Sequence, residues 1–231
     1  MRILHIFGSF DPGGAELRTV RLIQAFAAAG EHHIWVAAQQ RMGARGALGT
    51  EVPVRFPAEP AALVSGRPGL RRFAAIARAL GPYDLVLSYG WGAMDVVLAH
   101  RLFGWRGTLP PLIHHEDGFD SAHPERDRRR VLYRRLALGG VSALVVPSSS
   151  LADFARTHWR VREPQLVRIA NGVDLEASTA PARIDPLPRL DAMTGAVTVG
   201  TLARLRPEKN LPRLVRAVAA AGDDIRLIIA G

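Results

Sequence analysis

The chain has 231 residues, of which 48% are hydrophobic, and a formal net charge of +9 at pH 7. This length exceeds one typical domain but falls short of two full α/β domains, and no apolar run approaches the ~20 residues needed to span a bilayer. Because the chain contains no cysteine, disulfides and thiolate metal sites are excluded, and a cytoplasmic location is expected. The positive charge favours anionic partners: nucleotides, nucleic acid or an anionic membrane surface.

Strands and helices are predicted to alternate along most of the chain. Short apolar runs predict strands at 2–7, 33–38, 52–56, 84–88, 111–115, 143–147, 166–169, 197–201 and 225–230. Segments with one apolar face predict helices at 15–29, 66–80, 93–101, 125–138, 149–158 and 207–221. This alternation is typical of βαβ units with right-handed crossovers, so it predicts an α/β fold with a Rossmann-like parallel sheet.

The predicted elements group into two domains. The first covers residues 1–176, and a second, incomplete Rossmann-like domain covers 193–231. Between them, residues 177–192 are rich in proline and lack periodicity, which predicts a linker. The Gly- and Arg-rich segment 39–49 predicts a mobile loop within the first domain. Because two strands rarely form an independently stable sheet, we expect the chain to be a fragment of a longer protein, a broken gene product or one half of a complex.

A glycine-containing loop, Asp11-Pro12-Gly13-Gly14-Ala15-Glu16, follows the first predicted strand. Open α/β sheets bind ligands at this point, and paired glycines let a phosphate approach backbone N–H groups. The chain contains neither G-x-G-x-x-G nor a P-loop motif, and Ala38-Gln39-Gln40 supplies no acidic residue for a dinucleotide ribose. A phosphate-binding loop and a simple tight turn therefore stay open as interpretations.

A second polar cluster, His114-His115-Glu116-Asp117-Gly118, ends the predicted strand 111–115. Adjacent residues of a strand point to opposite faces, so one histidine is expected to face the crevice while the other packs or meets solvent. A crevice histidine suits a hydrogen bond to a substrate hydroxyl, and a loop histidine without a special role is the alternative. No H-E-x-x-H spacing is present, so no metal site is expected.

Lys209 is the only lysine among the 30 basic residues of the chain. Together with Arg204 it flanks a predicted strand-to-helix turn, and Pro207 suits the first helical turn. Free N–H groups and the helix dipole favour an anion there. The two cations therefore predict a diphosphate clamp, and a chance surviving lysine on a solvated turn is the alternative.

The predicted helix 125–138 carries six arginines and one aspartate between Arg126 and Arg135. This pattern fits a solvated face or a general preference for arginine. It also fits a helix lying on anionic lipid at the inner face of a membrane. Nucleic acid is not expected as a partner, because no aromatic interleaving or known binding module accompanies the charge.

Four motifs carry a resemblance to a known family. In order and spacing, GGAE (13–16), VVPS (145–148), NGVD (171–174) and VGTLARLRPEKN (199–210) resemble the family-4 retaining glycosyltransferases, which have the GT-B fold. The resemblance implies that Arg204 and Lys209 bind the diphosphate of the donor. It also implies that Gly13 and Gly14 approach the donor phosphate and that His115 is the catalytic histidine contacting the donor sugar.

The implied reaction transfers a sugar from a UDP- or GDP-linked nucleotide-sugar to a hydroxyl of a glycan or lipid-linked acceptor, with retention of anomeric configuration. No metal or other cofactor is implied. Further donor- or acceptor-side contacts are expected from Glu16, Glu116, Asp117, Ser148 and Asn171. Family members continue past the strand at 225–230 into a glutamate motif that grips the donor. We therefore expect truncation and little activity from this chain alone. A non-catalytic nucleotide-binding remnant and one half of a split enzyme are the alternatives.

Overall fold

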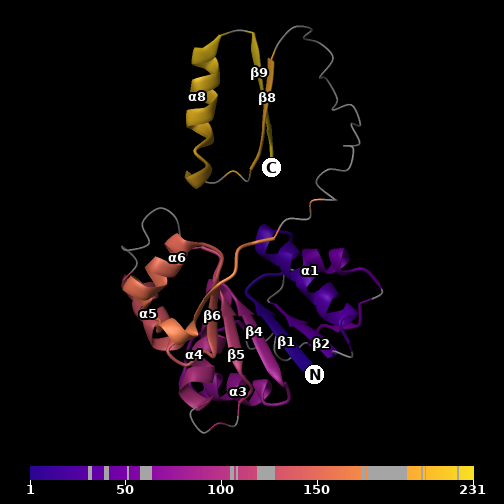
Figure 1. Ribbon diagram of the computed structural model, residues 1–231, viewed down its shortest axis with the longest axis vertical. Coiled ribbons are helices and arrows are strands. Elements are labelled where there is room, and N and C mark those ends of the chain that lie inside the picture. Colours follow the sequence, from indigo (N-terminus) through magenta and orange to yellow (C-terminus); the bar gives the residue numbers. More distant parts are fainter. Residues whose placement is uncertain are drawn as a thin grey trace. The chain divides into compact units, whose positions relative to one another are not determined.

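The computed structural model describes residues 1–30, 33–38, 42–50, 52–57, 64–104, 107, 109–118, 128–172, 175, 197–203, 205, 207–222 and 224–231 (Figure 1). The chain divides into two compact units, Met1–Gly172 and Val173–Gly231. The predicted linker, 177–192, lies outside the described residues.

The first unit is built on a parallel sheet of seven strands in the order β3-β2-β1-β4-β5-β6-β7. The strands are β1 (Arg2–Phe7), β2 (His33–Ala37), β3 (Val54–Arg55), β4 (Leu85–Tyr89), β5 (Leu112–His115), β6 (Ala143–Val146) and β7 (Leu166–Arg168). The order of the strands reverses between β1 and β4, and such a point is where open α/β sheets bind ligands. The predicted α/β class with a Rossmann-like parallel sheet is confirmed.

Helices cover both faces of this sheet (Figure 1). The helical segments are α1 (Gly14–Ala28), η1 (Gly43–Leu48), α3 (Leu70–Leu80), η2 (Trp91–Ala93), α4 (Met94–Phe103), α5 (Arg128–Leu138), α6 (Ser149–Phe154), the π-helix η4 (Ala155–Trp159) and η5 (Glu163–Gln165). The helix α1 packs on one face, which we call the α1 face, and α3 to α6 pack on the other, the α5 face. Alternation along β1 shows the division: Ile3 and Phe7 join the core of the α1 face, whereas Leu4 and Ile6 join that of the α5 face.

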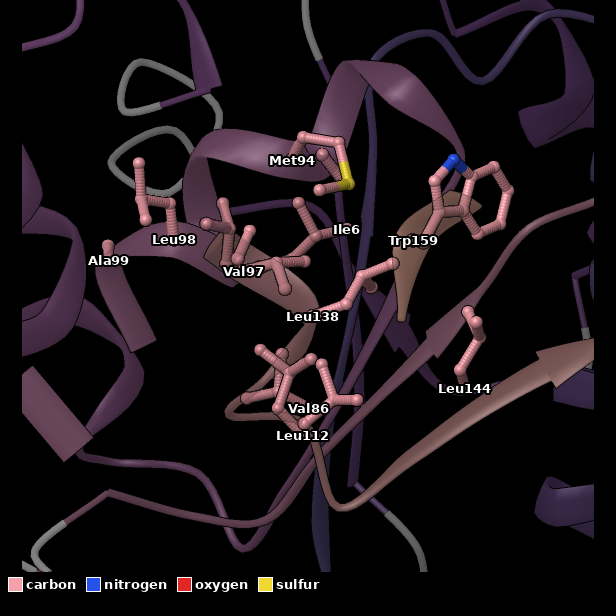
Figure 2. Close-up of a cluster of buried hydrophobic side chains, with 14 of the residues drawn as sticks. Ile6, Val86, Met94, Val97, Leu98, Ala99, Leu112, Leu138, Leu144 and Trp159 are labelled. Carbon is pink, nitrogen blue, oxygen red and sulfur yellow. The ribbon is translucent and has the colours of Figure 1, made fainter. Parts of the chain in front are cut away.

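The larger of the two cores lies on the α5 face. Figure 2 shows side chains from β4, β5 and β6 gathered with side chains from α4 and α5. Val86, Leu112 and Leu144 are fully buried, and Trp159 at the end of the π-helix is 1% exposed. This packing anchors the strands whose carboxyl ends carry the polar motifs, so those ends have defined positions.

Some boundaries differ from the predicted ones. The helix predicted at 66–80 begins only at Leu70, because the N-cap residue Gly69 is extended, with φ −177 and ψ 154. The segment 39–49, predicted as a mobile loop, contains the 3-10 helix η1, whose Leu48 is 3% exposed and which the sheet core holds in place. The helix predicted at 149–158 changes to π-helical geometry at Ala155, which carries Trp159 into the core.

The second unit contains a parallel pair of strands, β8 (Val197–Leu202) and β9 (Ile225–Ala230), connected through η6 (Pro207–Lys209) and α8 (Leu211–Ala221). The helix predicted from Pro207 instead begins at Leu211. Asn210 adopts the left-handed conformation with φ 47, and this interrupts the helical path. Lys209 therefore ends a 3-10 turn before the helix rather than lying in its first turn. An apolar groove of about 590 Å³ lies beside α8 and is lined by Leu211, Val215 and Ile229 among others.

Candidate active site at the carboxyl edge of the sheet

Two glycines, Gly8 and Gly92, lie in contact beside the point where the strand order reverses between β1 and β4. A Cβ atom on Gly92, which follows β4, would lie 2.4 Å from the Cα of Gly8, which follows β1. The backbones of these two loops are therefore in direct contact, and neither position accommodates a side chain. The peptide N–H of Gly90 donates to the carbonyl of His115 over 2.8 Å. The ends of β1, β4 and β5 thus form one connected edge.

The glycine-containing loop leads directly into α1. Gly13 is the N-cap, and its carbonyl accepts the first helical hydrogen bond, from Leu17 over 2.9 Å. The N–H groups of the first turn have no partner within the helix, and the dipole of this 15-residue helix favours an anion beside them. A Cβ atom on Gly14 would meet nothing within 4 Å, so a ligand has open space beside this backbone. Glu16 lies in the same turn and is partly exposed.

The residues at the end of β5 alternate between the two faces of the sheet. His114 is fully buried and Glu116 is 4% exposed on the α5 face. His115, partly exposed, stacks on Tyr89 of the α1 face with ring centroids 4.8 Å apart. Asp117 faces α1, where it pairs with Arg18. Of the two adjacent histidines, His115 is therefore the one with solvent access at the carboxyl edge.

Burial controls the protonation of the histidines on the α1 face. It lowers the pKa of His115 to about 4, and the neighbouring His114 and Arg18 act in the same direction, while Asp117 opposes them. Burial likewise lowers the pKa of His5 to about 3. The Nδ1 atom of His5 lies 2.9 Å from the hydroxyl oxygen of Tyr89, the ring on which His115 stacks. Both imidazoles are neutral at pH 7, so His115 offers a hydrogen-bonding ring without charge.

Arg18, on the second turn of α1, joins two of the sequence motifs. Its Nη1 donates to Oδ1 of Asp117 and its Nη2 donates to Oδ2 over 2.9 Å. The same Nη1 also donates to Oδ1 of Asn171, in the N-G-V-D motif after β7. Sequence reasoning did not identify Arg18. The only available signal was its spacing of four residues from Gly14, which places it one turn along the same helix face.

Arg134 holds Glu116 from the opposite face. Its Nε donates to Oε2 of Glu116 over 3.0 Å, and its side chain is 8% exposed. The carbon of its guanidinium group lies 4.7 Å from the ring centroid of Trp91 and 5.0 Å from that of Trp159. The Nε2 atom of His114 lies 3.8 Å from Oε2 of Glu116, and its Nδ1 lies 2.9 Å from the hydroxyl oxygen of Ser88. The carboxylate of Glu116 is thus turned inward rather than towards the edge.

The remaining predicted residue of this edge, Ser148, caps a helix. Its Oγ accepts a hydrogen bond from the N–H of Leu151 over 3.2 Å at the start of α6. This is a common role for serine before a helix. Gly13, Gly14, His115 and Ser148 all follow or end strands at the carboxyl edge, as predicted. Within the described part of the chain, no group of three histidine, aspartate or glutamate residues is arranged to hold a metal ion.

The arginine run does not form one solvated basic face. Residues 126 and 127 lie outside the described residues. Arg134 is buried, Arg135 donates its Nε to the carbonyl of His158, and Arg130 stacks on Trp91. Only the two arginines at the start of α5 are exposed among the described ones, together with Leu132 (65%) and Leu136 (56%). No helix in the described ranges is long and apolar enough to cross a bilayer.

The predicted diphosphate clamp is only partly described. Arg204 lies outside the described residues. Lys209 is exposed at the end of η6 in the second unit. Among the described residues, the lining of the apolar groove beside α8 does not include Lys209.

The fold described above is an α/β fold of the GT-B-like class. The chain belongs to glycosyltransferase family 4, whose family model matches residues 12–177. Part of the sequence is also similar to a GDP-mannose-dependent alpha-mannosyltransferase of Mycolicibacterium smegmatis. The two are 38% identical over 87 residues, which is 38% of this chain and 22% of that protein.

Solved structures show the same fold. The structure of HepE from Anabaena, in complex with UDP and glucose, superposes with a TM-score of 0.72 at 21% identity, covering 99% of this chain and 60% of HepE. The catalytic domain of starch synthase IV from Arabidopsis thaliana, bound to ADP and acarbose, gives a TM-score of 0.63 at 14% identity, covering 100% of this chain and 68% of that one. The chain thus spans 60% of the length of HepE, and the 87 residues aligned with the mannosyltransferase cover 22% of that protein.

Proposed function

We propose that this chain takes part in the transfer of a sugar from a UDP- or GDP-linked donor to a hydroxyl of a glycan or lipid-linked acceptor, with retention of anomeric configuration. The observation that carries the proposal is the edge where Gly14, at the open N-terminus of α1, and the partly exposed His115 share one face of the sheet in a member of glycosyltransferase family 4. In the reaction, the bond between the anomeric carbon and the donor diphosphate breaks. A new bond forms to the acceptor oxygen, and the acceptor proton leaves with the diphosphate.

The proposed role of His115 is a hydrogen bond to a hydroxyl of the donor sugar. A neutral imidazole suits this role, because its pKa of about 4 keeps it uncharged at neutral pH. Its ring is held by the stack on Tyr89. Such a hydrogen bond orients the donor sugar, and it accelerates the reaction to the extent that it is stronger in the transition state than in the ground state.

The donor diphosphate has two proposed sets of partners. Gly13 and Gly14 present the free N–H groups of α1, and the open space beside Gly14 permits close approach. In the second unit we assign Arg204 and Lys209 to the same diphosphate, as the family resemblance implies. Their contribution is electrostatic, because they offset the charge that grows on the departing group. No metal is assigned to the reaction.

Calorimetry tests the proposal with UDP-glucose and GDP-mannose as probes, together with UDP and GDP. We expect one of the two nucleotide-sugars to bind and His115→Ala to weaken its binding. The same substitution is expected to leave the binding of the matching nucleoside diphosphate within about twofold. Product analysis by mass spectrometry with an acceptor then measures transfer. Donor binding without transfer favours a non-catalytic nucleotide-binding remnant or a partner-dependent half of an enzyme. Absence of donor binding contradicts the proposal.

A second proposal concerns an anionic membrane surface at α5. The exposed Leu132 and Leu136 lie four residues apart, so they share one stripe of the helix, and Arg128 and Arg129 flank them at its start. Exposed leucines beside exposed arginines form the amphipathic pattern of helices that lie on anionic lipid. This patch is smaller than the sequence suggested, because Arg134 and Arg135 are engaged within the unit.

A further inference from the structure

Two helices hold the end of β5 from opposite faces of the sheet. On the α1 face, Arg18 pairs with Asp117, and on the α5 face, Arg134 pairs with Glu116. The two carboxylates are adjacent in sequence, and His115 immediately precedes them. The direction of the His115 side chain is therefore fixed by contacts on both sides of the strand end.

The pair on the α5 face is unusual because it is buried. The side chains of Arg134 and Glu116 are 8% and 4% exposed. Burying two charges costs free energy that their attraction does not always recover, and apolar replacements of such pairs are often neutral or stabilising. A buried pair is therefore weak evidence for a purely stabilising role. The stacking of Arg134 between Trp91 and Trp159 leaves its guanidinium group few alternative positions.

The ion pair of Arg134 and Glu116 also lies where it can fix the backbone at the end of β5. The backbone N–H of Glu116 donates to the carbonyl of Val145 over 3.0 Å, and the carbonyl of His115 accepts from Gly90. With its carboxylate anchored to α5, Glu116 fixes the peptide that carries His115 onto the α1 face. A Glu116 side chain without its partner would turn towards solvent, since a buried unpaired carboxylate is costly, and this rotation would pull His115 away from Tyr89.

We propose that Arg134 and Glu116 are positioning residues, which hold His115 against Tyr89 in the orientation that its contact with the donor sugar requires. This inference deepens the proposed function of His115 and rests on it. Neither residue touches the reacting atoms. Their effect is transmitted through the backbone of residues 115 and 116.

The test measures the pKa of the His115 imidazole by NMR in three variants: Glu116→Gln, Arg134→Met and the double variant. Each variant removes the ion pair that anchors residue 116 to α5. The strand end then loosens and exposes His115 to water, so the pKa of His115 is expected to rise from about 4 towards the ordinary 6.5 in all three. A direct charge effect predicts opposite shifts in the single variants, because one removes a negative charge and the other a positive charge. The double variant leaves no unpaired buried charge, so it is expected to fold even where a single variant unfolds. The pKa of His115 can then still be measured in the double variant.

Asp95→Asn is the matched control. Asp95 pairs with Arg72 and accepts a hydrogen bond from Tyr133 in the same helical layer. Its replacement is expected to lower the melting temperature without moving the pKa of His115. An unchanged pKa in the Glu116 and Arg134 variants, or shifts of opposite sign, would overturn the inference. The proposed function has a separate test. It is contradicted if His115→Ala leaves donor binding and transfer unchanged, even where the Glu116 and Arg134 variants shift the pKa of His115.

Discussion

Arg18 and Asp117, 99 residues apart in sequence, form a two-pronged ion pair that ties the second turn of α1 to the end of β5. Paired parallel hydrogen bonds of this kind are specific to the planar guanidinium group. Through the same group, Arg18 also holds Asn171 after β7. One side chain therefore connects the glycine loop, the histidine cluster and the N-G-V-D motif.

The first prediction is that Arg18→Ala weakens binding of the nucleotide-sugar roughly tenfold with only a small loss of stability. The side chains of Arg18 and Asp117 are 27% and 29% exposed, so the pair is expected to contribute about 1 kcal/mol or less to folding. Arg18→Lys should behave more like Arg18→Ala than like the unmodified chain, because an ammonium group cannot form the parallel bonds. Calorimetry and thermal denaturation measure the two effects. Arg71→Ala, an exposed arginine of α3, is the control, and equal affinities in all variants would contradict the prediction.

The second prediction separates two glycines by what surrounds them. Gly92→Ala should destabilise the protein by about 1–3 kcal/mol, because the new Cβ would lie 2.4 Å from the backbone of Gly8. Gly14→Ala should leave stability unchanged or slightly raised, since its Cβ meets nothing within 4 Å and alanine favours a helix. Gly14→Ala is nevertheless expected to weaken donor binding, because the methyl group occupies the space assigned to a phosphate. Urea denaturation and calorimetry of both variants test this contrast, and undiminished donor affinity in Gly14→Ala would argue against the phosphate assignment.

The strands were predictable from sequence because they appear as nearly continuous apolar runs, which is typical of parallel sheets covered by helices. The runs at 2–7 and 225–230 match β1 and β9. Helix ends were less predictable, because they depend on single backbone conformations. The extended Gly69 delays the start of α3, and the left-handed Asn210 delays the start of α8. Nothing in the residue types required either conformation.

The site was predictable to the level of strand ends but not of contacts. Strand alternation predicted that His114 and His115 would face opposite ways, and the structure places His115 on the α1 face. Strand alternation alone could not predict that the carboxylate of Glu116 turns inward to Arg134, because Arg134 lies 18 residues away in the sequence, on a helix. The arginine run gave a misleading signal there. Charge alone favoured a solvated or lipid-facing helix, whereas two tryptophans from distant segments enclose Arg134.

The third prediction concerns pH and follows from the histidines of the α1 face. The folded pKa values of His5 and His115, about 3 and about 4, lie below the ordinary 6.5. Below pH 6.5 the unfolded chain therefore binds protons that the folded chain does not, and stability falls as the pH decreases towards 4. His5→Gln, which cannot be protonated, should reduce this loss by roughly 2–3 kcal/mol between pH 6.5 and 4. Urea denaturation at several pH values measures the slopes, and parallel slopes for the two proteins would contradict the assignment.

The fourth prediction tests the surface of α5. Binding to vesicles that contain anionic lipid should fall at least about tenfold when Leu132 and Leu136 are both replaced by serine, because their exposed apolar area no longer enters the interface. Neutral vesicles should bind weakly throughout, and added salt should weaken binding to the anionic ones. Leu70→Ser, at a leucine of α3 that is more exposed (74%), serves as the control. Equal binding of all variants, or no preference for anionic lipid, would remove the membrane proposal.

The last prediction concerns Lys209, the single lysine of the chain. If it binds the donor diphosphate, Lys209→Ala should cost roughly 1.5–3 kcal/mol of binding, or about tenfold to a hundredfold in affinity, since one charge-assisted contact is lost. Lys209→Arg is the sharper test, because it keeps the charge but replaces a compact ammonium with a rigid planar group. At an exposed position that ends a 3-10 turn, neither change should alter stability. Arg213→Lys on the exposed side of α8 makes the converse exchange and is expected to change nothing. We expect calorimetry to show a clear loss of nucleotide-sugar binding in both Lys209 variants, with the fold checked by circular dichroism. Unchanged affinity in both would mean that this lysine is an incidental surface residue and that the diphosphate is held elsewhere.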